Sequence, residues 1–185
     1  MNSLLETFKM RAQAVNAEVH TVATAADALS FVKDFLKQEK IADTPKSYSV
    51  WANGSLLSGV DKQRLAAEIP GLKFDVTKDT AALSKVGISQ VDFAISDTGT
   101  VVQNAFAIEE RLVSSLPAIH VVFCPVNGIQ PDMATLFTKL HPKQCGYISM
   151  ITGPSRTADI ERVLTIGVHG PGRLVVVFVE ELGRN

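Results

Sequence analysis

The sequence is poor in cysteine, and it has neither an excess of one charge nor a long apolar run. Its two cysteines, Cys124 and Cys145, are too few for a disulfide scaffold, a zinc site built on cysteine or an iron–sulfur cluster. The 18 Lys and Arg residues balance 19 Asp and Glu residues, so no electrostatic footprint for nucleic acid is present. The longest strictly apolar run, from Leu174 to Val179, is far shorter than the ~20 residues of a membrane span. We therefore predict no metal site, no nucleic-acid partner and no membrane insertion.

The first residues do not resemble a secretion signal, because Glu6, Lys9 and Arg11 interrupt any apolar core. A length of 185 residues with 46% hydrophobic residues is typical of one compact globular domain. These features predict a soluble domain that resides in the cytoplasm.

Residues 1–46 are predicted to form a helical N-terminal region packed on the core. Apolar residues recur at helical spacing after residue 4, and Thr24 with Asp27 is a capping-box pattern that starts a second helix. The second helix should end before Pro45, because the residue preceding a proline is disfavoured in the α conformation. Between the two helices, the segment 18–22 is a candidate short strand.

Residues 47–185 are predicted to form an α/β domain. The nearly continuous apolar runs at 118–123 and 174–179 are typical of strands buried on both faces, as in a parallel sheet covered by helices. A helix is predicted at 131–140, and a brief helix at 81–86 that ends at Gly87. The fold class is therefore α/β, with a mostly parallel central sheet flanked by helices.

A hairpin is predicted around residues 91–102, where two apolar stretches flank the turn Asp97-Thr98-Gly99-Thr100. Gly99 should adopt a positive φ in that turn. Asp97 is a candidate catalytic or ligand-binding carboxylate, but aspartate is also a common turn residue that bonds its own backbone.

The segment 151–161 carries the most chemical information. A strand leads into Gly153-Pro154, followed by Ser155, Arg156 and Thr157 and an apparent helix start. In open α/β sheets, ligands bind beyond the carboxyl ends of the strands, and a helix N-terminus there attracts an anion. Alternatively, Ser155 or Thr157 only caps the helix while Arg156 pairs with an acidic residue at 159 or 161. The segment lacks the Gly-Lys-Ser/Thr ending of a P-loop, and no dinucleotide fingerprint predicts NAD or flavin.

Three other polar residues are relevant to a site. His169, in the glycine-rich loop 167–172, is available as an acid, a base or a ligand, or else it holds the loop. Arg111 reaches an anion or ties the sheet to its neighbour. His120 lies inside an apolar strand and is interpreted as a core histidine with its hydrogen bonds satisfied.

These segments occur in a characteristic order, and together they resemble the LUD domain family over residues 87–180. The matching elements are Asp97–Thr100, Arg111, Ser115–Pro117 with His120, Ile151–Glu161 and Gly167–Pro171. The resemblance implies a Rossmann-like fold similar to that of sugar-phosphate isomerases and coenzyme A transferases. It also implies membership of a bacterial system that oxidises L-lactate to pyruvate. In such systems, the lactate utilization proteins A and B contain the cysteines for iron–sulfur clusters, and the cysteine-poor composition found here fits a third, cluster-free component.

The leading hypothesis is a cluster-free subunit or accessory protein of an L-lactate oxidising complex, with a pocket for a small organic anion and no cofactor of its own. His169 and Asp97 are its predicted catalytic residues. The predicted anion-binding residues are Ser155, Arg156, Thr157, Gly170, Thr98, Gly99 and Arg111. This hypothesis requires Arg156 and His169 to face one hollow. The alternatives are a stand-alone enzyme acting on a phosphorylated sugar or acyl donor, and a purely structural or regulatory module.

Overall fold

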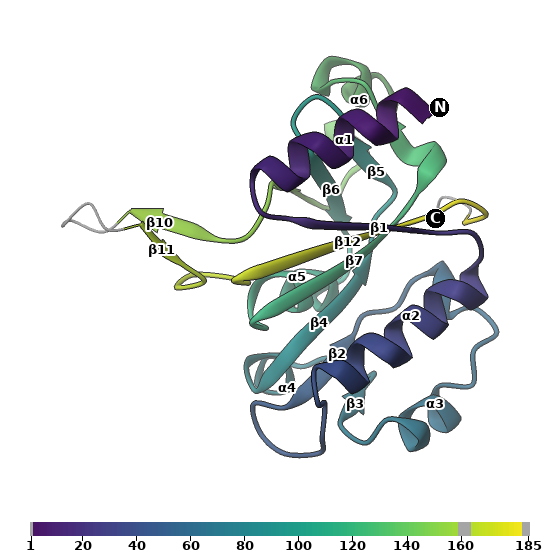
Figure 1. The fold of residues 1–185 in the computed structure, drawn as a ribbon, viewed down its shortest axis with the longest axis vertical. Helices are drawn as coiled ribbons and strands as arrows, with labels where there is room; N and C mark the ends of the chain where they lie inside the picture. Colours follow the sequence, from purple (N-terminus) through teal and green to yellow (C-terminus); the bar gives the residue numbers. More distant parts are fainter. Residues whose placement is uncertain (1, 159–163, 183–185) are drawn as a thin grey trace.

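A six-stranded sheet in which all neighbouring strands are parallel forms the centre of the chain (Figure 1). The computed structural model describes residues 2–158 and 164–182. The strands lie in the order β1-β12-β7-β4-β2-β3. Their bounds are β1 (Glu18–Val22), β2 (Tyr48–Trp51), β3 (Leu72–Lys73), β4 (Ser84–Gln90), β7 (Ile119–Pro125) and β12 (Arg173–Val179). The predicted fold class, an α/β domain with a mostly parallel central sheet, is confirmed.

A second, smaller sheet packs beside the first and has the order β8-β5-β6-β9. Its strands are β5 (Phe93–Ile95), β6 (Thr100–Ala105), β8 (Ile129–Gln130) and β9 (Tyr147–Ile151). β5 and β6 form the predicted antiparallel hairpin, and Gly99 adopts the expected positive φ of 65° in its turn. The strand expected to lead into Gly153-Pro154 is β9, and it pairs antiparallel with β6 in this small sheet.

Helices cover both faces of the main sheet. They are α1 (Asn2–Ala14), α2 (Ala25–Gln38), α3 (Lys62–Glu68), α4 (Lys78–Ala82), α5 (Ile108–Ser115) and α6 (Met133–Lys139). α2 begins at the predicted capping box: the Asp27 N–H donates to Thr24 Oγ1 at 3.1 Å, and the Thr24 N–H donates to the Asp27 carboxylate at 3.0 Å. Within the described ranges, none of these helices is long and apolar enough to cross a bilayer.

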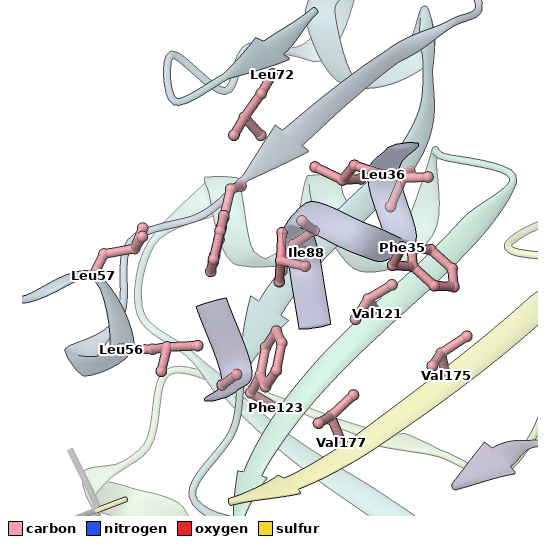
Figure 2. Packing of buried hydrophobic residues seen from close by; sticks show 14 of the residues in the cluster. Phe35, Leu36, Leu56, Leu57, Leu72, Ile88, Val121, Phe123, Val175 and Val177 are labelled. Atoms are coloured by element: carbon pink, nitrogen blue, oxygen red, sulfur yellow. The ribbon is translucent and has the colours of Figure 1, made fainter. Parts of the chain in front are cut away.

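Two apolar layers, one on each face, pack the main sheet against the surrounding helices and the small sheet. Figure 2 shows one layer, in which Phe35 and Leu36 of α2 pack over Ile88, Val121 and Val175 of the central strands. On the opposite face, α1 and the small sheet cover β7 and β12 (Figure 1). The central strands are therefore buried on both faces, which explains their continuous apolar runs.

The first 46 residues contribute directly to the main sheet. The predicted strand at 18–22 is present as β1, and it pairs in parallel with β12 over its whole length. α1 and α2 flank this edge strand in the sequence and pack on opposite faces of the sheet. The first and the last strands in the sequence of the main sheet thus lie side by side (Figure 1).

The helix predicted at 81–86 is wrong. α4 ends at Ala82, and the central strand β4 begins at Ser84. Strand β4 contains the small residues Gly87 and Ser89, which weaken its apolar pattern. The structure explains the glycine: a Cβ at Gly87 would lie 2.0 Å from the Val113 carbonyl oxygen of α5. Gly87 therefore lets α5 approach the backbone of the sheet closely.

The helix start predicted after Ser155 is also wrong. Residues 156–158 form β10 (Arg156–Ala158), which pairs antiparallel with β11 (Leu164–Ile166). This hairpin projects from the body of the domain (Figure 1). The backbone of residues 156–158 forms hydrogen bonds with β11 instead of starting a helix. The acidic residues 159 and 161, considered as partners for Arg156, lie outside the described residues.

Replacing Gly87 by alanine is expected to destabilise the domain strongly. The added methyl group would overlap the Val113 carbonyl oxygen and lie 2.8 Å from Pro117 Cγ, so α5 must move away from β4. We expect the free energy of unfolding to fall by about 2–3 kcal/mol, measured by urea unfolding.

Gly172→Ala is the matched control, because a Cβ there meets its nearest neighbour at 3.5 Å, an ordinary van der Waals contact. Its unfolding free energy should change by no more than about 0.5 kcal/mol. Equal losses in the two variants would contradict the close approach of α5.

Candidate functional site

A hollow of about 320 Å³ lies at the amino ends of β7 and β12. Its polar side chains are hydroxyl and imidazole groups from several segments: Ser114, Ser115, His120, Ser149, Thr152, Ser155 and His169. This volume falls at the lower end of the range for ligand pockets, so it suits a small molecule. None of the lining residues that the structure describes has a carboxylate side chain.

The hollow opens at the end of the sheet opposite to the one expected. The sequence argument placed a ligand beyond the carboxyl ends of the parallel strands. At the carboxyl ends of β2 and β4, however, the Gln90 side chain is engaged with the loop after β2. Its Nε2 donates to Ser55 Oγ at 2.7 Å, and its Oε1 accepts from the Leu56 N–H at 2.9 Å.

One wall of the hollow is the last turn of α5. Ser114 Oγ donates to Gln103 Oε1 of β6 at 2.9 Å, and Ser115 Oγ donates to the Arg111 carbonyl. The Arg111 guanidinium lies over the Tyr147 ring, 5.3 Å from its centroid. Arg111 lies one turn before the two serines on the same helix, and it does not line the hollow.

A second wall is formed where the chain entering β10 meets the loop before β12. The Ser155 N–H donates to the Pro171 carbonyl at 2.8 Å, and the Gly167 N–H donates to the Ser155 carbonyl at 2.9 Å. Gly170 allows a close contact, because a Cβ there would lie 3.2 Å from the Ser155 Cβ. The structure thus brings together three of the predicted site residues, Ser155, His169 and Gly170.

Arg156 does not join this group. Its guanidinium donates to the Val15 carbonyl, next to the end of α1, and it does not line the hollow. The sequence argument required the side chains of Arg156 and His169 to face one shared hollow. The structure does not bring them together in this way. Thr157 lies in β10 opposite Thr165, and its side chain is outside the part of the chain that the structure describes.

The predicted residues of the β5–β6 turn lie against α1. A Cβ on Gly99 would be 2.4 Å from the Ala12 nitrogen, and the Asp97 N–H donates to the Pro131 carbonyl at 3.1 Å. Neither of them lines the hollow. Thr98 is connected to it indirectly, through a chain of hydroxyl contacts: Thr98 to Thr100 at 2.8 Å and Thr100 to Thr152 at 2.7 Å.

His120 was interpreted as a satisfied core histidine, and the structure corrects half of that interpretation. The residue is fully buried, and its Nε2 lies 2.8 Å from Ser89 Oγ. Its Nδ1 has no hydrogen-bond partner among the described residues, and the side chain lines the hollow. Burial lowers the pKa of His120 to about 4, so the ring is neutral at pH 7. The signal for it in the sequence was a histidine inside an otherwise apolar strand.

Neither cysteine belongs to the hollow. Cys124 is fully buried in β7, and burial raises the pKa of its thiol, with the Asp92 carboxylate adding to the shift. A thiol held in its neutral form is a poor nucleophile, so Cys124 acts as a small buried apolar residue.

A larger hollow of about 570 Å³ adjoins the first and shares Ser115, His169 and Gly170 with it. Its lining includes Lys46 and Lys85. The Lys85 ammonium pairs with the Glu39 carboxylate at 2.7 Å. His169, exposed at the boundary, is accessible from both spaces.

Together, the fold and the hollow define a parallel α/β domain with a small polar hollow beside its central strands. Comparison with known proteins identifies the family. The profile of the LUD domain matches residues 5–179, so the chain belongs to the LUD domain family. The matched region includes most of α1 and all of α2, as well as the motifs after residue 87.

Several curated relatives carry names that refer to lactate. Lactate utilization protein C of Exiguobacterium sp. AT1b is 28% identical over 195 residues, covering 97% of this chain and 79% of the relative. The protein of the same name from Halalkalibacterium halodurans is 34% identical over 109 residues, covering 56% and 47%. Uncharacterized protein YkgG of Escherichia coli is 34% identical over 130 residues, covering 64% and 56%. The matches to the last two span about half of each relative.

A solved structure supports the fold. The crystal structure of a DUF162 family protein from Deinococcus radiodurans superposes with a TM-score of 0.61 over 96% of this chain and 97% of that chain. At 18% sequence identity, this likeness concerns the fold alone.

The neutral state of His120 predicts a pH dependence of stability. Its pKa is depressed in the folded chain from an ordinary value of 6.5 to about 4, so its contribution is complete above pH 6.5 and is lost as the pH falls towards 4. Between pH 7 and pH 5, we expect this residue to lower the free energy of unfolding by about 2 kcal/mol. Urea unfolding at several pH values in this range, above the ordinary pKa of the carboxylates, measures the effect.

His120→Asn should show a flatter pH profile over the same range, because it removes this titrating group. Identical profiles for the two proteins would contradict a neutral, buried His120.

Proposed function

We propose that this chain acts in lactate utilization, as the component without an iron–sulfur cluster of a system that oxidises L-lactate to pyruvate. We further propose that it binds a small carboxylate in the hollow between α5, β9 and the loop before β12. The observation that carries the proposal is the convergence of Ser155, His169 and Gly170 on a polar hollow, in a chain whose relatives are named for lactate utilization.

The hydroxyl groups that line the hollow suit both L-lactate and pyruvate. L-lactate and pyruvate share a carboxylate and differ at the second carbon, which carries a hydroxyl in one and a carbonyl in the other. A serine or threonine hydroxyl can either donate or accept a hydrogen bond, so Ser149 and Ser155 can serve both forms. The exposed imidazole of His169 at the boundary is the candidate for proton transfer.

The proposed partners are the lactate utilization proteins A and B, which would supply the iron–sulfur clusters. Within these 185 residues there are two cysteines, whereas a protein-bound cluster is usually held by four. Cys124 is also buried in the core of β7. The chain's own part is therefore to bind and position the acid, while electron transfer belongs to the partners.

Isothermal titration of the purified chain with L-lactate and with pyruvate tests the binding site. His169→Ala should weaken binding about tenfold, because it removes an imidazole hydrogen bond at the hollow. Arg64→Ala, an exposed residue of α3, is the charge control and should bind as the wild type does.

Arg156→Ala distinguishes the observed hollow, which Arg156 does not line, from the pocket predicted from the sequence, which includes Arg156. Because the guanidinium is engaged with the Val15 carbonyl, its removal should change affinity less than twofold, whereas a loss equal to that of His169→Ala would place Arg156 in the site. Failure of the wild type to bind either acid, together with no co-purification with proteins A and B, would refute the proposed function.

The second candidate is a stand-alone enzyme acting on a phosphorylated sugar or acyl donor. The adjoining hollow favours it, because its lining includes Lys46 and Lys85, and lysine is a common phosphate-binding residue. Since the Lys85 ammonium already pairs with Glu39, Lys46 is the candidate phosphate ligand. Turnover of such a substrate by the isolated chain, lost in Lys46→Ala, would support this candidate over the first.

A further inference from the structure

We propose that His120 is a buried binding residue of the hollow, and that its Nδ1–H donates a hydrogen bond to a carboxylate or carbonyl oxygen of the bound acid. The identity of the ligand as a small oxo or hydroxy acid rests on the proposed function. The role of His120 rests on its position, its single partner and the polarity of the hollow.

The position of His120 follows from the register of three central strands. His120 of β7 lies opposite Gly87 of β4 on one side and Leu174 of β12 on the other. Leu174 also lines the hollow, and Gly87 has no side chain. The imidazole is therefore the polar group that the inner strands contribute to the hollow, near the serines at the end of α5.

The partner of Nε2 determines the tautomer of the ring. Ser89 Oγ lies 2.8 Å from Nε2, and the Ser89 hydroxyl has no second partner among the described residues. If Nε2–H donated to the serine, the buried hydroxyl hydrogen of Ser89 would be left without an acceptor. The arrangement that uses both groups has the Ser89 O–H donating to Nε2, which places the ring proton on Nδ1.

The protonated Nδ1 then needs an acceptor that the described part of the chain does not supply. Buried polar atoms in folded proteins almost always have a hydrogen-bond partner, so an orphaned N–H beside a hollow calls for a specific explanation. A ligand oxygen is such an acceptor. Because Nδ1 is shielded from solvent in the free chain, binding must shift the wall of the hollow enough to admit one oxygen atom.

The charge of the lining defines the class of ligand. Among the described residues, no Asp or Glu lines the hollow, so they offer a cationic ligand no counter-charge. A neutral ring donor, together with the hydroxyl groups of Ser149 and Ser155, solvates an oxyanion or a polarised carbonyl oxygen. The combination fits a small carboxylic acid better than an amine or an apolar molecule.

NMR of the wild-type chain tests the tautomer without a ligand and without a mutation. Long-range ¹H–¹⁵N correlation of the histidine rings should show His120 with a protonated Nδ1 and an unprotonated Nε2. Addition of pyruvate should move the Nδ1–H proton downfield as it forms a hydrogen bond. A ring protonated at Nε2, or saturating pyruvate binding that leaves the His120 signals unchanged, would overturn the inference.

A pair of amide variants locates the donor on the ring. In His120→Asn the amide nitrogen lies near the position of Nδ1, and in His120→Gln it lies near that of Nε2. We expect His120→Asn to bind pyruvate within about threefold of the wild type, and folded His120→Gln to bind about tenfold more weakly. Equal losses in the two variants would overturn the assignment of Nδ1.

These outcomes are distinct from failure of the proposed function. If the wild type binds neither pyruvate nor L-lactate, the proposed ligand fails together with this inference. If it binds them while His120 does not respond, only the inference fails and the hollow remains the site.

Discussion

The parallel pairing of β7 with β4 and β12 is the constraint on which the rest of the structure depends. It places Gly87, His120 and Leu174 in one row across the centre of the sheet. The glycine lets α5 lie close to β4, and the end of α5 then supplies Ser114 and Ser115 to the hollow. The same backbone contact that stabilises the domain thus also positions one wall of the candidate site.

The loop that carries His169 is held at both of its ends. At its start, the Gly167 N–H bonds to the Ser155 carbonyl. At its end, Arg173 pairs with the carboxylates of Glu18 and Glu39, on β1 and at the end of α2. The hydrogen bond from Arg173 lowers the pKa of Glu18, which favours the ionised pair at neutral pH. The exposed imidazole therefore lies on a loop whose ends are anchored to the sheet.

Local patterns were sufficient to predict the elements whose formation is governed by nearby residues. The capping box at Thr24 identified the start of α2, and the uninterrupted apolar run identified β12. β4 was missed because a central strand that accepts a close helix contact carries Gly87 and Ser89 in place of branched apolar residues. The chain after Ser155 was misassigned because its partner strand β11 follows it in the sequence, and a helix-like polar pattern does not reveal that pairing.

The sequence by itself determined the α/β class, the hairpin at Gly99, and the gathering of hydroxyl, guanidinium and imidazole groups in glycine-bearing turns. The tertiary structure alone decided which of these groups meet. Arg156 bonds to Val15, which is 141 residues away, and His120 bonds to Ser89 on a neighbouring strand. Such contacts depend on strand order and register, which arise from packing of the whole core. For this reason the hollow lies at the amino ends of the strands, and a residue interpreted as core is placed at its wall.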